Sequence, residues 1–420
     1  MRLLLVAANT ERLNMPTLPV GLAQVAGAAG RAGHLVDFLD LMFQPDPLDA
    51  VGRAIESTRP ELIGISIRNI DDQDIQNQTF LLEKARGVVN ACRLGEVPVV
   101  LGGPGYSIFP REALKYLGAD MGIAADGEGA FCSLIERLET GSDLADLAGL
   151  YLPGREGIDP DFSRPLSDCA VPVEYLGGCA DPANPDIWVP VQSRRGCPNA
   201  CSYCSTFLIQ GKTIRSTPPE LVVEGVERLA QRGFHRFFFV DNSFNIPRAH
   251  ALELCRLLRQ LKPPVAWRCI LYPEKVDEDL VEAMARAGCC QVSLGFESGD
   301  ERVLEQMNKR FSPGDVRHTV DLLAHHGIQR LGFLLLGGPG ETRQSVERSL
   351  AFADSLGLEG LRTTIGLRIY PHTPLEQRAI EDGIIERDRD LLRPRFYLAP
   401  ALDPWIFERV MPGMHRREEK

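Results

Sequence analysis

The chain has 420 residues, of which 44% are hydrophobic and 25% are charged, and its formal net charge is -11. This length and composition are typical of a globular protein with two or three domains. The negative charge argues against a nucleic-acid partner. The sequence contains no run of about 18 apolar residues, so no membrane span is predicted.

The cysteines and the N-terminus point to a reducing compartment. Eleven cysteines without a signal peptide predict a cytoplasmic protein. Residues 1–8 are apolar, but this run is too short for the hydrophobic core of a signal peptide. We interpret it as a first buried strand.

The first 140 residues alternate between apolar strands and amphipathic helices. Strands are predicted at Arg2–Ala8, His34–Leu41, Glu61–Ile67, Pro98–Gly102 and Met121–Ala125. Helices are predicted at Val20–Ala32, Pro47–Ser57, Asn77–Leu94, Arg111–Leu117 and Ala130–Leu138. Nearly continuous apolar strands indicate a parallel sheet covered on both faces. We predict an α/β, flavodoxin-like doubly wound (Rossmann-type) domain with strand order 2-1-3-4-5 and a ligand crevice beside strands one and three.

Three loops open at the carboxyl edge of this predicted sheet. The candidate binding residues on them are Asn9, Thr10, Arg68, Asn69, Asp71, Gly102, Gly103 and Ser107. Glycine lets the backbone approach a ligand closely because it carries no side chain. Neither GxGxxG after the first strand nor GxxxxGK[ST] occurs, which argues against a dinucleotide or a nucleoside triphosphate.

Residues 141–187 are rich in Gly, Pro and Asp and are predicted to be a linker. Cys169 and Cys179 lie in it without metal-ligand spacing and are interpreted as inert. From residue 188 to 385 the strand–helix alternation resumes, with about six parallel strands that fit a partial (β/α)6 barrel of the TIM type. Residues 386–420 form a C-terminal tail, which covers the open side of that barrel or frays.

Three cysteines lie close together directly after the first strand of this second half. Cys197, Cys201 and Cys204 occur in the sequence CPNACSYC. Three thiolates on one loop can reach a single soft metal centre and leave an iron–sulfur cube one ligand short. The competing interpretation is half of a zinc site, but no second ligand pair at matching spacing follows.

This motif resembles the cluster loop of the radical S-adenosylmethionine (SAM) enzymes, with an aromatic residue, Tyr203, before the third cysteine. The resemblance implies that the three cysteines hold a [4Fe–4S] cluster. It also implies that the free iron chelates SAM, whose reductive cleavage gives a 5′-deoxyadenosyl radical. An electron donor such as flavodoxin or ferredoxin is the implied partner.

Polar and glycine residues at the carboxyl ends of the following strands are the candidates to bind SAM. They are Asp241, Asn242, Glu297, Ser298, Arg310, Gly337, Gly338 and Arg368. Glu297 could bind ribose hydroxyls or cap the next helix. Arg310 and Lys309 could pair with the methionyl carboxylate or be solvated cations at a helix end, and the second alternative is favoured for Lys309.

The N-terminal half is similar to the cobalamin-binding domains of one large radical SAM subgroup. The similarity includes the Gly102-Gly103 loop and Asp126-Gly127-Glu128-Gly129. No Asp-x-His-x-x-Gly motif is present, and His34, at a helix-to-strand turn, is interpreted as structural. A bound cobalamin would therefore lack a histidine ligand from the protein, and a domain that kept the fold but lost the cofactor stays open.

Together these resemblances imply a cobalamin-dependent radical SAM enzyme, and we expect it to methylate an unactivated carbon of a small metabolite, natural product or peptide. Oxidative cyclisation or rearrangement is the alternative within the same chemistry. An RNA methylthiotransferase would need further N-terminal cluster cysteines, which Cys92 and Cys132 do not supply. A non-catalytic iron–sulfur or corrinoid-binding protein remains as an alternative from another class.

Overall fold

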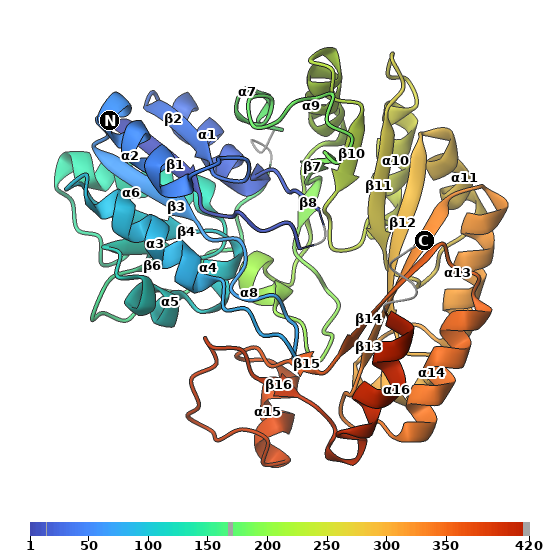
Figure 1. Cartoon of the computed structure of the whole chain (residues 1–420). Helices are drawn as coiled ribbons and strands as arrows, with labels where there is room; N and C mark the ends of the chain where they lie inside the picture. Colours follow the sequence, from blue (N-terminus) through green and yellow to red (C-terminus); the bar gives the residue numbers. More distant parts are fainter. Residues whose placement is uncertain (14, 167–170, 415–420) are drawn as a thin grey trace. The chain divides into compact units, whose positions relative to one another are not determined.

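The computed structural model describes residues 1–13, 15–166 and 171–414 (Figure 1). Cys169 and the charged end of the tail, 415–420, lie outside the described residues. The chain forms two compact units whose segments alternate along the sequence. Unit 1 comprises 1–72, 79–196 and 206–234, and unit 2 comprises 73–78, 197–205 and 235–420. The predicted domain limits at residues 140, 187 and 385 remain a prediction.

Unit 1 contains the predicted parallel sheet. Its strand order is β2-β1-β3-β4-β5-β6, and all neighbours pair in parallel except β5 and β6. The strands are β1 (Arg2–Ala7), β2 (Leu35–Asp40), β3 (Leu62–Ser66), β4 (Val99–Gly102), β5 (Met121–Ile123) and β6 (Leu150–Tyr151). The predicted order 2-1-3-4-5 is confirmed, and β6 adds an antiparallel strand at the edge of the sheet.

Helices cover this sheet, as the apolar strands require. They are α1 (Val20–Arg31), α2 (Pro47–Thr58), α3 (Leu82–Arg93), α4 (Pro104–Ile108), α5 (Pro110–Leu117) and α6 (Gly127–Thr140). Helices α1 and α6 pack against each other, and so do α2 and α3 (Figure 1). Residues of β1, α1 and α6 share one apolar core with Leu5, Ala26 and Leu134 fully buried. Gly118 and Gly141 end α5 and α6 in the left-handed conformation that glycine adopts without strain.

The later segments of unit 1 surround the cysteine loop in sequence. They are α7 (Val173–Leu176), β7 (Val189–Val191), β8 (Arg194–Arg195), α8 (Thr206–Gln210), β9 (Arg215–Ser216) and α9 (Pro219–Gln231). Strands β8 and β9 pair antiparallel, with Arg195 opposite Arg215. Strand β8 lies directly before the cysteine loop, where the sequence analysis predicted no separate strand. The partner strand β9 comes from 20 residues further along the chain, where no strand had been predicted.

Unit 2 contains five parallel strands in the order β14-β13-β12-β11-β10. They are β10 (Arg236–Phe239), β11 (Ala266–Leu271), β12 (Cys289–Glu297), β13 (Gln329–Leu336) and β14 (Gly360–Ile365). The helices between them are α10 (Arg248–Leu258), α11 (Glu278–Arg286), α12 (Glu301–Gln306), α13 (Pro313–His325) and α14 (Arg343–Ser355). Ser312 and Thr342 begin α13 and α14 with capping boxes, and Asp277 and Asp300 cap α11 and α12. The predicted alternation is confirmed.

The tail is folded over most of its length. It follows β15 (Leu367–Arg368) and α15 (Pro374–Glu381), and it contains β16 (Phe396–Tyr397), a short 3₁₀ turn (Pro400–Leu402) and α16 (Trp405–Met414). Ile406 is fully buried, and Arg409 forms an ion pair with Glu347 of α14. Helix α16 therefore packs on unit 2 rather than fraying.

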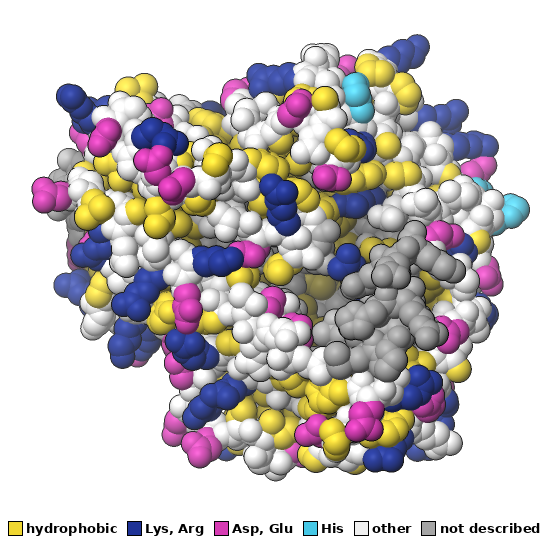
Figure 2. Space-filling model, viewed as in Figure 1, with side chains coloured by type: hydrophobic (Ala, Val, Ile, Leu, Met, Phe, Trp, Pro, Cys, Tyr) yellow, Lys and Arg dark blue, Asp and Glu magenta, His cyan; other side chains and the backbone are white. Residues whose placement is uncertain are grey.

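Charged side chains of both signs are interspersed on the face drawn in Figure 2. Among the described residues, no helix has the length and apolarity to cross a membrane.

Candidate functional site

The three cysteines lie on a loop that unit 2 holds through its backbone. The Ser202 N–H donates to Met307 O at 3.0 Å, and the Leu375 N–H donates to Ser202 O at 2.9 Å. Within the loop, the Cys204 N–H donates to Cys201 O at 3.2 Å. Because residues distant in sequence bind Ser202 on both sides, the middle of the loop has a defined position in unit 2.

The segment after α12 also fastens this loop. The Asn308 side-chain amide donates to Ala200 O at 2.6 Å, and the Arg310 guanidinium donates to Pro198 O at 3.1 Å. The guanidinium of Arg310 thus binds the loop backbone, and its pairing with the methionyl carboxylate remains a prediction. Both contacts involve neutral carbonyl oxygens, so they fix the loop without neutralising the cation.

Lys309 is buried under the loop, and the expectation that it is a solvated helix-end cation is wrong. Its side chain is 5% exposed, and its Nζ lies 3.2 Å from Glu297 Oε1. The Tyr203 hydroxyl donates to the same oxygen at 2.9 Å. Asn308, at φ +55°, turns the chain after α12 and directs the next residue inward.

Aromatic rings complete the surroundings of this ammonium group. The Nζ of Lys309 lies 5.3 Å from the ring centroid of Tyr203, 5.9 Å from that of Tyr272 and 5.7 Å from that of Phe311. Burial alone would lower the pKa of Lys309, but Tyr203 and Glu297 outweigh it and raise that pKa well above its usual value. The ammonium group therefore keeps its charge beside the cluster loop.

The thiols themselves form a set that fits an iron–sulfur cluster. Burial raises the pKa of Cys201, the neighbouring thiols Cys204 and Cys197 raise that pKa further, and Lys309 opposes the rise. Cys197 and Cys204 are therefore close enough to Cys201 for their charges to act on it. Soft sulfur donors of this number match a cluster with one iron left for another ligand.

Several other predicted residues at the edge of unit 2 serve internal contacts. The Ser298 hydroxyl lies 2.8 Å from that of Ser349 and accepts from the Asp300 N–H at 3.1 Å. Arg368 donates to Ile369 O at 2.6 Å and to Leu391 O at 2.7 Å. These two side chains therefore support α14 and the tail. Asp241, which is buried, and Asn242 follow β10 as predicted.

Gly337 and Gly338 form a turn that binds a carboxylate of the protein itself. Both backbone N–H groups donate to Glu341 Oε2, the second at 2.9 Å. The other oxygen, Oε1, is buried without a hydrogen-bond partner among the described residues. Burial raises the pKa of Glu341 to about 7, while the two N–H groups oppose this rise. The sequence analysis missed this use of the glycine amides.

In unit 1, four predicted residues line one cleft at the carboxyl ends of β1 and β3. Asn9, Thr10, Arg68 and Asn69 lie there, and the Asn69 amide donates to Asn9 Oδ1 at 3.4 Å. Asp71 is buried two residues beyond the cleft. The sequence analysis predicted a crevice beside strands one and three, and the structure has one at that place.

The loop after β4 packs against β3, and one of its glycines is required for this contact. Gly103 has φ +95°, and a Cβ there would lie 2.6 Å from Ile67 O. The Ser107 hydroxyl donates to Gly103 O and accepts from the Ala125 N–H, both at 2.8 Å. Ser107 thus holds the turn, whereas Gly102 ends β4. The segment expected to be a glycine-rich loop continues as helix α4.

The cleft of unit 1 has a volume of only about 20 Å³, so a corrinoid would lie over the loops that line it rather than inside it. The amide and hydroxyl groups of the cleft can bind the carboxamides that surround a corrin ring. His34 is the only histidine before residue 235, and its Nδ1 lies 3.2 Å from the amino group of Met1. It is therefore engaged at the opposite, amino edge of the sheet, in agreement with its structural interpretation.

Comparison with known families assigns both halves. Residues 8–135 match the B12 binding domain, and residues 191–353 match the radical SAM superfamily. Together these domains imply cobalamin, a [4Fe–4S] cluster and SAM as cofactors.

Among curated proteins, an uncharacterized methyltransferase of Pyrococcus horikoshii is 26% identical over 92% of this chain and 84% of its own. The tryptophan 2-C-methyltransferase of Streptomyces laurentii is 24% identical over 90% of this chain and 74% of its own. The anaerobic magnesium-protoporphyrin IX monomethyl ester cyclase of Rubrivivax gelatinosus is 24% identical over 80% of this chain and 61% of its own.

Among solved structures, the radical SAM methyltransferase TsrM of Kitasatospora setae matches with a TM-score of 0.84 at 22% identity, covering 99% of this chain and 90% of that one. At this level of identity the similarity shows a shared fold, and the α/β fold predicted from the sequence is confirmed. With both domain types present in the predicted order, the chain belongs to the radical SAM enzymes that carry an N-terminal B12-binding domain.

Proposed function

We propose that this protein is a cobalamin-dependent radical SAM methyltransferase that acts on an unactivated carbon of a small molecule. One observation carries this proposal: a single chain joins the three-cysteine loop to a B12-binding domain, and relatives similar over at least 90% of it are methyltransferases. When bound, the cluster supplies the electron that cleaves the sulfonium of SAM, and cobalamin supplies the methyl group.

Within this function, Cys197, Cys201 and Cys204 would hold the cluster. Lys309 would stabilise the thiolates, since its ammonium group is buried beside Cys201 and is surrounded by aromatic rings. Tyr203 and Glu297 keep that charge in place through their shared oxygen contact. These side chains would therefore favour the charged, thiolate form of the cysteines and keep water away from the side of the loop that faces Lys309.

The positions of the candidate residues suggest which of them would bind cobalamin and which would bind SAM. Asn9, Thr10, Arg68 and Asn69 would bind the corrin carboxamides, because they line the cleft of unit 1. Asp241 and Asn242 follow β10 at the carboxyl edge of the sheet and would bind SAM. Gly103, Ser107, Ser298 and Arg368 would act by holding loops, as their contacts support.

An external protein such as flavodoxin or ferredoxin would supply the electron. The cysteine-rich composition is consistent with a reducing compartment for the enzyme.

Labelled SAM tests the proposed methyl transfer. Anaerobically reconstituted protein is incubated with reductant, small-molecule extract and SAM whose methyl group carries three deuterium atoms. Methyl transfer predicts a product that carries the label, together with S-adenosylhomocysteine from the methyl donor and 5′-deoxyadenosine from the abstraction of the substrate hydrogen. The similarity to the Rubrivivax cyclase favours cyclisation as the second candidate, which would give 5′-deoxyadenosine and an unlabelled product. Formation of neither nucleoside product would contradict both.

A further inference from the structure

Two short strands of unit 1 form a stem at the base of the cluster loop. Strand β8 ends at Arg195, two residues before Cys197, and β9 begins at Arg215. In the antiparallel pair, Arg195 and Arg215 lie directly opposite each other. Like charges in such a position destabilise a strand pair. The stem therefore needs negative charge from elsewhere in order to stay closed.

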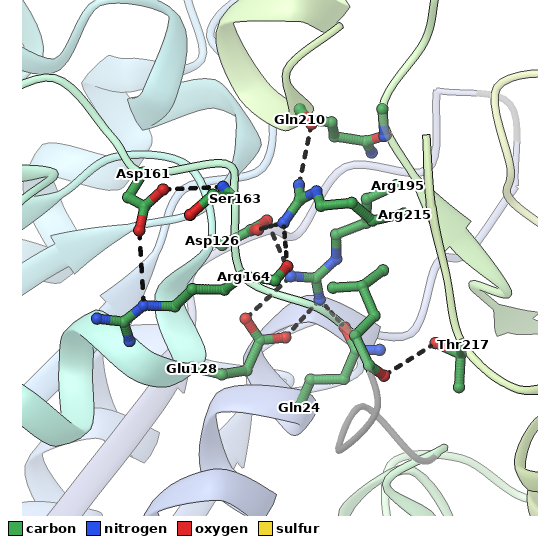
Figure 3. Close-up of polar contacts among 12 residues, drawn as sticks. Gln24, Asp126, Glu128, Asp161, Ser163, Arg164, Arg195, Gln210, Arg215 and Thr217 are labelled. Carbon is green, nitrogen blue, oxygen red and sulfur yellow. Dashed lines mark hydrogen bonds and ion pairs between the residues drawn. The ribbon is translucent and has the colours of Figure 1, made fainter. Parts of the chain in front are cut away.

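Arg195 uses all its donors in a buried network drawn in Figure 3. Its Nε donates to Gln192 Oε1 at 2.9 Å, and its Nη1 donates to Asp126 Oδ1 at 2.9 Å. Nη1 and Nη2 bind the two oxygens of Glu128 in a fork. Nη2 also donates to Gln24 Oε1 at 2.7 Å. A guanidinium has five N–H donors, so each has a partner here.

Arg215 is held by the same carboxylate from the other side. Its Nη1 binds Asp126 Oδ2, and its Nη2 donates to Gln210 O at 3.0 Å (Figure 3). Gln210 ends α8, the helix that directly follows the cluster loop. The Gln210 side chain also accepts from the Gly196 N–H at 3.3 Å, just before Cys197. One network thus holds the segments on both sides of the loop.

The position of Asp126 supports a function in this network. It is the N-cap residue of α6, but its side chain forms no hydrogen bond with the first turn of that described helix. An N-cap aspartate normally accepts such a bond. Here the carboxylate is directed to Arg195 and Arg215, whose side chains are each 8% exposed. Two arginines and two carboxylates leave the network without net charge.

We infer that Asp126 is a positioning residue for the cluster. It closes the stem by neutralising the facing Arg195 and Arg215, and so the B12-binding domain fixes where the cluster loop begins and ends. The inference rests on the cluster loop and not on methyl transfer, so it can fail or succeed independently of the proposed reaction.

The test uses the variant Asp126→Asn, which keeps the shape of the side chain and removes its negative charge. Asp161→Asn is the matched control, because Asp161 pairs with Arg164 near this network and acts on Arg215 only through its charge, with no hydrogen bond or ion pair to either stem arginine. The double variant Asp126→Asn/Arg215→Gln removes one of the facing charges. Each protein is reconstituted anaerobically, and iron content and the EPR spectrum of the reduced cluster are measured with and without SAM.

We expect Asp126→Asn to lower the fraction of chains with the SAM-dependent EPR change by about tenfold, since it loses hydrogen bonds to charged groups. Asp161→Asn should match the wild type, and the double variant should recover much of the signal. An unchanged Asp126→Asn spectrum, or an equal loss in Asp161→Asn, would overturn the inference. Should Asp126→Asn not fold, the double variant decides: a folded, iron-loaded protein supports the inference, and a protein without iron overturns it.

Discussion

Gly102 and Gly103 are neighbours at the end of β4, and the structure predicts that substitution by alanine destabilises the protein at Gly103 but hardly at Gly102. A Cβ on Gly102 would lie 3.6 Å from Ile123 O, an ordinary contact. A Cβ on Gly103 would lie 2.6 Å from Ile67 O, 2.7 Å from Ser66 Oγ and 2.9 Å from Ile67 N. Gly103 also has φ +95° and ψ 167°, a combination that only glycine adopts without strain.

The size of the effect follows from these two costs. The backbone conformation costs about 1–3 kcal/mol for a residue with a side chain. Displacing well-packed atoms costs about 1–3 kcal/mol more. We therefore expect Gly103→Ala to lower the free energy of unfolding by about 2–6 kcal/mol, and the melting temperature of the B12-binding domain by roughly 5–20 °C. Gly102→Ala should change the melting temperature little.

The assay is thermal unfolding of both variants, followed by circular dichroism without added cobalamin. Leaving cobalamin out separates the strain in the loop from any contact with the corrin. Equal melting temperatures for Gly103→Ala and the wild type would refute the argument, and so would an equal loss in both variants.

Three further predictions concern single side chains. The raised pKa of Glu341, about 7, means that the folded state keeps a proton that the unfolded chain releases above about 4.5. The contribution of Glu341 to the protein's free energy of unfolding should therefore fall by about 3 kcal/mol as the pH rises from 5 to 8. Glu341→Gln should remove this component in urea unfolding at the two pH values, and equal pH dependence would contradict it. Lys309→Met leaves the buried Glu297 carboxylate without its cation while Tyr203 still donates to it, so we expect the free energy of unfolding by denaturant to fall by about 3–5 kcal/mol, together with reduced iron content. The exposed Lys275→Met serves as control, and the idea fails if both variants match the wild type. His34→Asn should leave the cobalt content per chain unchanged, because His34 binds the N-terminus; a fall in cobalt would point to a ligand role.

Local patterns made much of this protein predictable. The three cysteines proposed to hold the cluster lie within a segment of eight residues, so their spacing alone indicates a common centre. The strand order of unit 1 follows from the apolar strands and the helices between them, because short connections leave few topologies. For the same reason the cleft residues Asn9 and Arg68 could be placed at one edge of the sheet.

The remaining features depend on contacts between segments distant in sequence. The partners of Arg195 come from residues 24 and 126–128, and no pattern near Arg195 indicates them. The burial of Lys309 depends on the turn at Asn308 and on Tyr203, about 100 residues earlier. Arg368 binds a carbonyl group of a later loop, and the sequence around its own strand does not indicate this contact.

The most direct test of the account is the EPR spectrum of the reconstituted, reduced protein before and after addition of SAM. The account predicts a [4Fe–4S] signal that changes when SAM binds the iron without a cysteine ligand, and the loss of that change when Cys201 is replaced by alanine. Zinc in place of iron, or a cluster signal that SAM does not alter, would contradict it.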